Sequence, residues 1–192
     1  MLFRSTQTMW VAMGESTYAV LGYIKWNMGY HAMLASPMGV RDVLRGHFLS
    51  IATQLALATS IFMAIAALFG GFSSWAALWC LPIAVLTGMA FVTPIFAFTA
   101  KQEGDDGFNI LFRLVMIPLF LFSGTFFPIG QLPALLEGIA RVTPLWHGVE
   151  LARDATLGRL AVADLGHTAY LLAWVVVGTW LAVDGLRRRM AV

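Results

Sequence analysis

Two side chains that could take part in chemistry, His147 and Glu150, lie three residues apart in the stretch PLWHGVE. On a helix this spacing places both on one face, where an imidazole and a carboxylate could bind a metal ion or transfer protons. A metal site needs a third protein ligand, and nothing in the sequence obviously provides one. We therefore favour an interfacial helix whose polar side chains face water or the chain's own polar groups. A membrane-embedded enzyme that uses His147 and Glu150 at the outer face is the alternative.

Sequence motifs for ATP hydrolysis and for hydrolytic chemistry are absent. The sequence contains no Gly-x-x-x-x-Gly-Lys-Ser/Thr phosphate loop, no His-Glu-x-x-His pair and no Gly-x-Ser-x-Gly nucleophile elbow. Its single cysteine, Cys80, can form neither an intramolecular disulfide nor a thiolate metal cluster. The net charge of +2 is small, and the basic residues lie at the edges of apolar blocks, which argues against a nucleic-acid partner. We expect no catalytic site, metal or cofactor in this chain.

Three further charged positions have both a structural and a functional interpretation. Glu137 precedes Arg141 by four residues, the order that stabilises a helix, so we favour a surface ion pair over a role in guiding substrate. Glu15 interrupts an incomplete apolar block, where a functional carboxylate and a position near a polar interface are equally plausible. Arg113 lies near the start of another block, and we expect its side chain to reach the cytoplasmic surface.

The composition indicates that helices crossing a membrane position these residues. Of the 192 residues, 59% are hydrophobic and 11% are charged, against about 25% charged in a typical soluble domain. Because a helical span needs about 20 apolar residues, we predict an all-α, polytopic transmembrane bundle. It comprises a partial N-terminal span over residues 9–24 and four full spans, over residues 48–69, 75–100, 108–127 and 168–186. Pro82 and Pro94 are expected to kink the second of these spans.

The basic residues predict the orientation of this bundle. Eight of them fall on one side of the four spans: Lys25, Arg41, Arg45, Lys101, Arg113 and residues 187–189. Three fall on the other side: Arg141, Arg153 and Arg159. Positive loops stay inside, so residues 25–47, the 101–107 loop and the C-terminus are expected in the cytoplasm. Residues 128–165 are expected outside, with short re-entrant or interfacial helices before the last span.

The segment before the first full span has its own pattern. Ser36 and Pro37 resemble an N-cap and a first helical residue, which predicts a helix starting there and running into the span. Upstream, residues 23–35 predict a short surface helix with Trp26, Tyr30 and Met33 on one side. For the methionines at positions 13, 28, 33 and 38, ordinary apolar packing is the preferred interpretation.

At the outer end of the third expected span, the stretch FLFSGTFFPIGQLP closes an apolar run. Pro128 is a plausible stop for the helix, and Ser123 and Gly124 would allow a neighbouring helix to approach closely. Packing and gating remain equally open for these two small residues.

The longer stretch LFLFSGTFFPIGQLPALLEGIARVTPLWHGVELAR, residues 119–153, resembles the signature region of ABC-2 type transporter permeases. The resemblance extends back through YHAMLASPMGVRDVLRGH and covers about residues 7 to 190. Within the family, the chain resembles drug-resistance permeases and lipo-oligosaccharide (nodulation-factor) export permeases. The family has six spans per subunit and cytoplasmic termini. The first span and the start of the second are missing here, so the resemblance implies an N-terminally truncated chain or a misassigned start.

The resemblance also implies partners and site residues. Two permease subunits, identical or different, would pair in the cell membrane with two separate ATPase subunits, which bind the ATP and Mg²⁺. A coupling helix within residues 26–42 would dock on the ATPase, with these residues carrying the role: Trp26, Tyr30, His31, Met33, Leu34, Pro37, Arg41 and Asp42. Short helices would seal the outer end of the route, with these residues forming the outer gate: Ser123, Gly124, Pro128, Gln131, Pro133, Pro144, His147, Gly148 and Glu150.

The function implied is export of an amphipathic, lipid-linked or drug-like substrate across the cytoplasmic membrane, driven by the ATPase subunit. A scaffold that only assembles with other membrane proteins is a weaker alternative.

Overall fold

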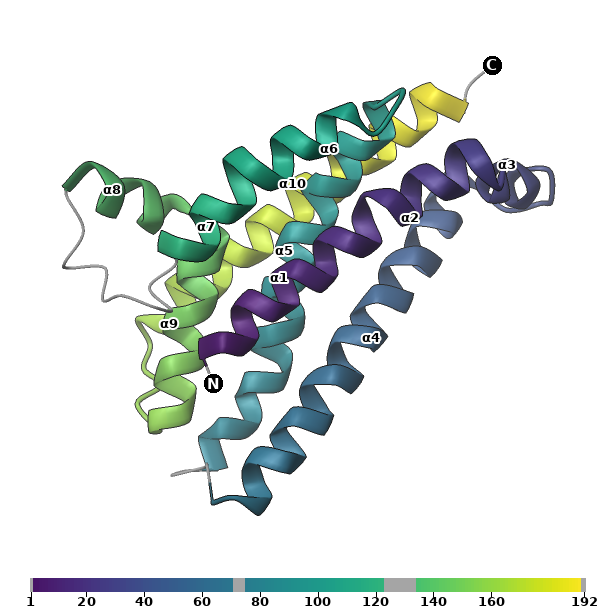
Figure 1. Cartoon of the computed structure of the whole chain (residues 1–192). Coiled ribbons are helices and arrows are strands. Elements are labelled where there is room, and N and C mark those ends of the chain that lie inside the picture. Colours follow the sequence, from purple (N-terminus) through teal and green to yellow (C-terminus); the bar gives the residue numbers. More distant parts are fainter. Residues whose placement is uncertain (1, 71–74, 123–133, 191–192) are drawn as a thin grey trace.

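The computed structural model describes residues 2–70, 75–122 and 134–190, and within these ranges it contains helices and turns but no strand. Figure 1 shows the arrangement. The helical elements, in chain order, are α1 (Leu2–Ser16), α2 (Tyr18–Leu21), η1 (Gly22–Trp26), α3 (Gly29–Leu34), α4 (Val40–Leu68), η2 (Trp75–Trp79), α5 (Cys80–Lys101), α6 (Asp106–Ile110), η3 (Leu111–Met116), α7 (Ile117–Phe122), α8 (Ala134–Val142), α9 (Pro144–Leu157) and α10 (Asp164–Met190). The predicted all-α class is confirmed for the described residues.

Three helices in the described part of the chain are long and apolar enough to cross a membrane: α4, α5 together with the preceding turn η2, and α10. They coincide with the expected spans at residues 48–69, 75–100 and 168–186. The helix α4 has 29 residues, which at 1.5 Å per residue exceeds the roughly 30 Å hydrocarbon core of a bilayer. Its first turns therefore extend beyond the apolar stretch that the sequence marks.

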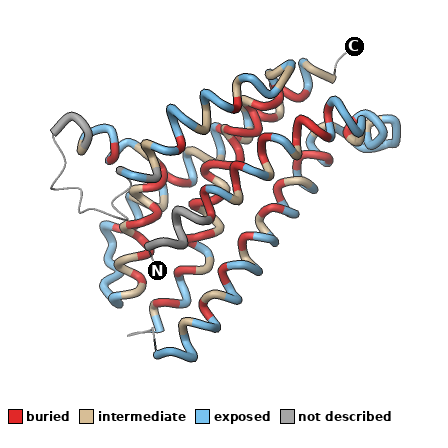
Figure 2. Tube along the Cα trace, viewed as in Figure 1, coloured by how far each residue is buried: buried red, intermediate tan, exposed pale blue. Residues whose placement is uncertain are grey.

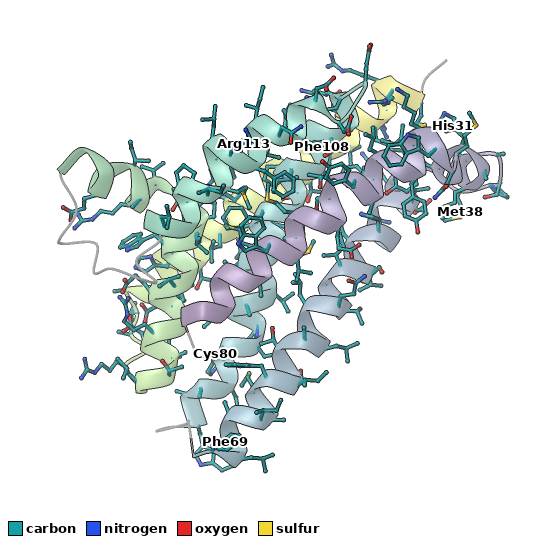
Figure 3. The ribbon with its side chains drawn as sticks, viewed as in Figure 1. His31, Met38, Phe69, Cys80, Phe108 and Arg113 are labelled. Atoms are coloured by element: carbon teal, nitrogen blue, oxygen red, sulfur yellow. The ribbon has the colours of Figure 1, made fainter. Side chains whose placement is uncertain are left out.

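The expected span at residues 108–127 is described as far as Phe122, as α6, η3 and α7 in succession. The middle element, η3, is a wide π-helical turn that ends just before Pro118. Proline has no N–H to donate, and its ring crowds the preceding turn of the helix. The wide π-helical turn before Pro118 gives that ring room. Arg113, which Figure 3 labels on this segment, is exposed.

The centre of the molecule is α5, which packs against α1, α4, α9 and α10. Within the most apolar window of each helix, 61% of the residues of α5 are buried, against 22% for α4 and 28% for α10. Figure 2 shows the same pattern as buried positions along α5 and exposed ones along the outer side of α4. Pro94 lies in the interior of α5. Pro82 lies in its first turn, where a proline removes no hydrogen bond of α5, so the kink expected at Pro82 is not required there and stays a prediction.

The partial N-terminal span is helical and belongs to the core. Met9, Ala12 and Met13 of α1 are fully buried, and α1 packs along α5. The hydroxyl of Thr99 in α5 donates a 2.7 Å hydrogen bond to the carbonyl of Ser16. Glu15 is half-buried near the end of α1. This segment therefore packs as an integral helix of the bundle.

One end of the molecule brings together three segments that are far apart in the sequence. The Lys25 ammonium donates a 2.7 Å hydrogen bond to the carbonyl of Glu103. Arg189, near the C-terminus, donates to the carbonyl of Ala100 at 3.0 Å and also to that of Gln102. Figure 1 shows α3, the loop before α6 and the C-terminus at this end, and α8 and α9 at the other. The segments expected on one side of the membrane therefore lie together.

Candidate functional site

The segment that the resemblance assigns to ATPase coupling is interrupted where the sequence predicted one helix over residues 23–35. The π-helical turn η1 ends at Trp26, and Met28 then adopts a left-handed conformation, with φ of 47°, before α3 begins at Gly29. This break shifts the helical register. Tyr30 consequently points inward and is buried, while Trp26 and Met33 are exposed, so the prediction that these three residues share one side is wrong.

Four large apolar side chains of this segment are between 40% and 61% exposed, and we call them the α3 tip: Trp26, Met28, Met33 and Met38. Lys25, Asn27 and His31 are exposed in the same segment. Figure 3 shows Met38 and the neighbouring His31 at the extreme end of the molecule. The prediction of ordinary apolar packing is correct for Met13, which is fully buried. It is wrong for Met28, Met33 and Met38, whose side chains are exposed.

The helix α4 begins three residues later than Ser36 and Pro37 predicted. The Ser36 hydroxyl donates to the carbonyl of Met33 at 2.5 Å, so it closes α3 instead of capping α4. Gly39 is the N-cap of α4, in an extended conformation, and its N–H donates a 3.1 Å hydrogen bond to the Asp42 carboxylate. Asp42 therefore holds the first turn of α4 together, whereas Arg41 beside it is exposed.

At the opposite end, α8 and α9 form the described part of the expected outer gate. Thr143 is the extended N-cap of α9 and Pro144 its first residue, a position that proline favours. Gly158, with φ of 67°, ends the helix. A Cβ at Gly148 would overlap the side chain of Thr87, so this glycine lets α9 pack closely on α5. Five of the gate residues, Ser123, Gly124, Pro128, Gln131 and Pro133, lie outside the described residues.

His147 and Glu150 have separate partners in the described structure. The Nδ1 atom of His147 lies 2.6 Å from Nδ1 of His167 at the start of α10, and its ring stacks on Tyr170 with centroids 4.0 Å apart. Burial, and then the neighbouring His167, lower the pKa of His147 below its ordinary value of 6.5. Glu150 forms an ion pair with Arg153.

His147 and Glu150 therefore do not bond to each other in the described structure. Among the described residues, no group of three or more His, Cys, Asp or Glu side chains is placed to hold a metal ion. Glu137 and Arg141 form the predicted surface pair, with a nitrogen–oxygen distance of 2.6 Å. The described polar side chains of α8 and α9 thus engage the chain itself.

An apolar crevice beside these helices was not anticipated from the sequence. It has a volume of about 780 Å³ and lies between α5, the η3–α7 segment and the turn that joins α8 to α9. Phe91, Met116 and Ile139 are among the side chains that line it. Each looks like an ordinary apolar residue of its own helix. Only the packing of helices that are distant in the sequence brings them to one cavity.

The three apolar helices, the central buried α5 and the clustering of basic segments at one end define a polytopic, helical membrane protein. The family model for the ABC-2 type transporter matches residues 5–157, and the chain belongs to this family. It is therefore a membrane subunit of an ABC-type transporter, and the sequence resemblance is confirmed.

Curated relatives carry the name Nodulation protein J. The chain is 33% identical over 187 residues to that of Rhizobium leguminosarum bv. trifolii, an alignment that covers 97% of this chain and 71% of the relative. It is 29% identical over 187 residues to that of Rhizobium meliloti (strain 1021), with the same 97% and 71% coverage. For Bradyrhizobium diazoefficiens the identity is 26% over 177 residues, covering 92% of this chain and 67% of the relative. No solved structure matches the chain.

Proposed function

We propose that this chain is the permease subunit of an ATP-driven exporter. Two permease subunits would pair in the cytoplasmic membrane, and a separate ABC ATPase subunit would dock on the α3 tip of each. ATP binding shifts the population of permease conformations only if nucleotide-bound ATPase fits one of them better than the other. ATP and Mg²⁺ would be bound by the ATPase subunit, and this chain would supply the substrate route.

The exposed α3 tip is the observation that carries this proposal. Protein surfaces that face water seldom expose several large apolar side chains together unless a partner or a lipid covers them. Methionine side chains are flexible and polarisable, which suits a docking surface that must stay bound while the partner moves. The tip lies beside Arg41 and at the end of the molecule where Lys25 and Arg189 hold the other segments together. The excess of basic residues favours a cytoplasmic position for this end.

An amphipathic or lipid-linked substrate is the class that we propose. The family resemblance to lipo-oligosaccharide and drug-resistance permeases supports it, as do relatives named for nodulation. The apolar crevice of about 780 Å³, next to the α8–α9 turn, would suit the hydrocarbon part of such a molecule. His147, Gly148 and the rest of the signature region would then seal the outer end of the route.

Charge substitution on the α3 tip tests the docking assignment. The double variant Trp26→Glu/Met33→Glu should reduce the recovery of ABC ATPase subunits with the tagged chain from native membranes by at least about tenfold, because apolar interface anchors commonly contribute 2 kcal/mol or more. Both positions are exposed, so the bundle should fold normally. Quantitative mass spectrometry of the purified complex measures the recovery.

The matched control is Val162→Glu, which places the same charge at an exposed apolar position in the turn between α9 and α10. It should leave recovery unchanged. Undiminished recovery with the double variant would overturn the docking assignment, and failure of the unmodified chain to retain any ABC ATPase would overturn the permease proposal. Asp42→Arg is a poorer probe, because it removes the cap of α4.

A further inference from the structure

The six-residue helix α3 buries one side chain, that of Tyr30, which is 2% exposed. The other side chains of α3 are exposed or half-buried. A helix this short is not stable by itself in water. It is also separated from its neighbours, by the left-handed Met28 on one side and the extended Gly39 on the other. Its position relative to the bundle therefore depends on how Tyr30 is held and on Leu34, which is half-buried and packs against the same core.

Tyr30 enters a cage built from three other elements. Tyr23 of η1 stacks on its ring, with centroids 5.4 Å apart and planes inclined by 17°. His47 of α4 meets it edge-on, and the Tyr30 hydroxyl lies 3.2 Å from the Nδ1 atom of His47. Phe96 of α5 contacts both rings, with centroids 6.3 Å from Tyr30 and 5.4 Å from His47. One side chain of α3 thus contacts both of the long helices α4 and α5.

The hydrogen bond between Tyr30 and His47 is directional, unlike the ring contacts around it. Burial, and then the neighbouring Tyr23, raise the pKa of Tyr30 above its ordinary value of 10.0, so its hydroxyl stays protonated and can donate. A polar pair inside an apolar cage strongly disfavours displacements that separate the partners, because neither can turn to water instead. The other ring nitrogen of His47 is also buried, and the backbone of Glu15 lies beside this imidazole, so Tyr30 is the side chain that bonds to Nδ1 of His47.

We propose that Tyr30 is a positioning residue that joins the α3 tip to α4 and α5 through His47. Movement of α3 by a docked ATPase then moves His47 and Phe96 with it, so the nucleotide state reaches the membrane-spanning helices through this joint. The inference rests on the proposed docking of the ATPase at the α3 tip. It assigns Tyr30 to the inner side of that segment, where it transmits movement without contacting the partner.

The variant Tyr30→Phe keeps the ring and removes the hydroxyl. The complex of the full chain with its co-purified ABC ATPase is compared by hydrogen–deuterium exchange with and without a non-hydrolysable ATP analogue. In the unmodified complex, nucleotide should change exchange in both α3 and the first half of α4. In Tyr30→Phe the change should remain in α3 and fall about fivefold in α4, the factor that corresponds to one hydrogen bond of about 1 kcal/mol. ATPase recovery should stay close to that of the unmodified complex, and the melting temperature should fall by only about 2–4 °C for each kcal/mol that the lost hydrogen bond contributed.

Tyr23→Phe is the matched control, because it removes a hydroxyl from the stacked neighbour and leaves the bond to His47 in place; it should behave like the unmodified chain. His47→Phe removes the same bond from the other side. If Tyr30→Phe folds poorly, His47→Phe is measured in its place and should show the same reduced exchange response in α4. A full response of α4 in Tyr30→Phe or His47→Phe, or no response of α4 in the unmodified complex, would overturn the joint. Loss of the ATPase from the unmodified chain would instead contradict the docking proposal.

Discussion

Single glycines determine how closely the helices of this bundle approach one another. A Cβ on Gly178 of α10 would lie 2.8 Å from the backbone nitrogen of Pro94 and would overlap the side chain of Thr93. Gly148 of α9 is pressed in the same way against Thr87. Both neighbours belong to α5, so these two positions allow α9 and α10 to reach the central helix. Small residues at helix contacts are the usual means of such close packing in membranes.

Gly178→Ala should destabilise the protein, because the proline backbone that the new methyl group meets cannot move aside as a flexible side chain could. Overpacking of this kind costs about 1–3 kcal/mol. The measurement is the thermal unfolding midpoint of the purified chain in detergent. Gly166→Ala, in the same helix, has open space around its Cβ and should be neutral or stabilising by up to about 1 kcal/mol. Equal midpoints for the two variants would contradict the close contact.

At the level of elements, the contact between α9 and α10 depends on the protonation of His147. The hydrogen bond between His147 and His167 joins their two Nδ1 atoms, so one Nδ1 must donate and the Nδ1 of the other ring must accept. At most one of the two rings can therefore be charged. The groups around His147 include Trp146 of α9, His167 and Tyr170 of α10 and the backbone of Arg141 in α8. Glu150, one turn further along α9, is the acid on the same face, and its carboxylate pairs with Arg153.

Acidification should therefore weaken this contact. The pKa of His147 is lowered on folding, so the unfolded chain binds the proton more readily, and the stabilisation is complete above pH 6.5 and is lost as the pH falls through the lowered value. Between pH 7.5 and 5.0 the melting temperature of the unmodified chain should fall further than that of His147→Gln, which cannot titrate. Parallel losses in both proteins would show that other groups cause the acid sensitivity.

At the scale of the whole molecule, the two ends differ in character. One end holds α3, the loop after α5 and the C-terminus, joined by hydrogen bonds from Lys25 and Arg189 to backbone carbonyls. The other holds α8, α9 and the turn after α4, where Phe69 lies at the tip of the molecule (Figure 3). The excess of basic residues predicts that the first end faces the cytoplasm.

Cysteine labelling tests this orientation directly, because Cys80 is the single cysteine of the chain and can be replaced by alanine. In that background, Val162→Cys at the α9–α10 turn should react in intact cells with a maleimide that cannot cross the membrane. Gly104→Cys, in the loop before α6, should react only after the cells are opened. The reverse labelling pattern would invert the orientation and would place the α3 tip outside, where no ATPase could reach it.

Parts of this fold follow from local sequence. The apolar blocks at residues 48–69, 75–100 and 168–186 predict helices because a span needs about 20 consecutive apolar residues, a property that composition alone reveals. The pair Glu137–Arg141 follows from the spacing of four residues on a helix. The prediction that α4 begins at Ser36 and Pro37 is wrong. The Ser36 hydroxyl donates to the carbonyl of Met33, and the Asp42 carboxylate accepts from the N–H of Gly39 at the start of α4.

What the sequence by itself determined is the class of the molecule, its family and which end carries the positive charge, since these depend on composition, block length and motif. Only the tertiary structure turned Tyr30 inward, because a left-handed Met28 shifts the register, and non-glycine residues rarely adopt that conformation. It also brought His167 to His147 and assembled the crevice between α5, α7 and α8. Those contacts join residues on different helices, and each helix would satisfy its own apolar pattern without them.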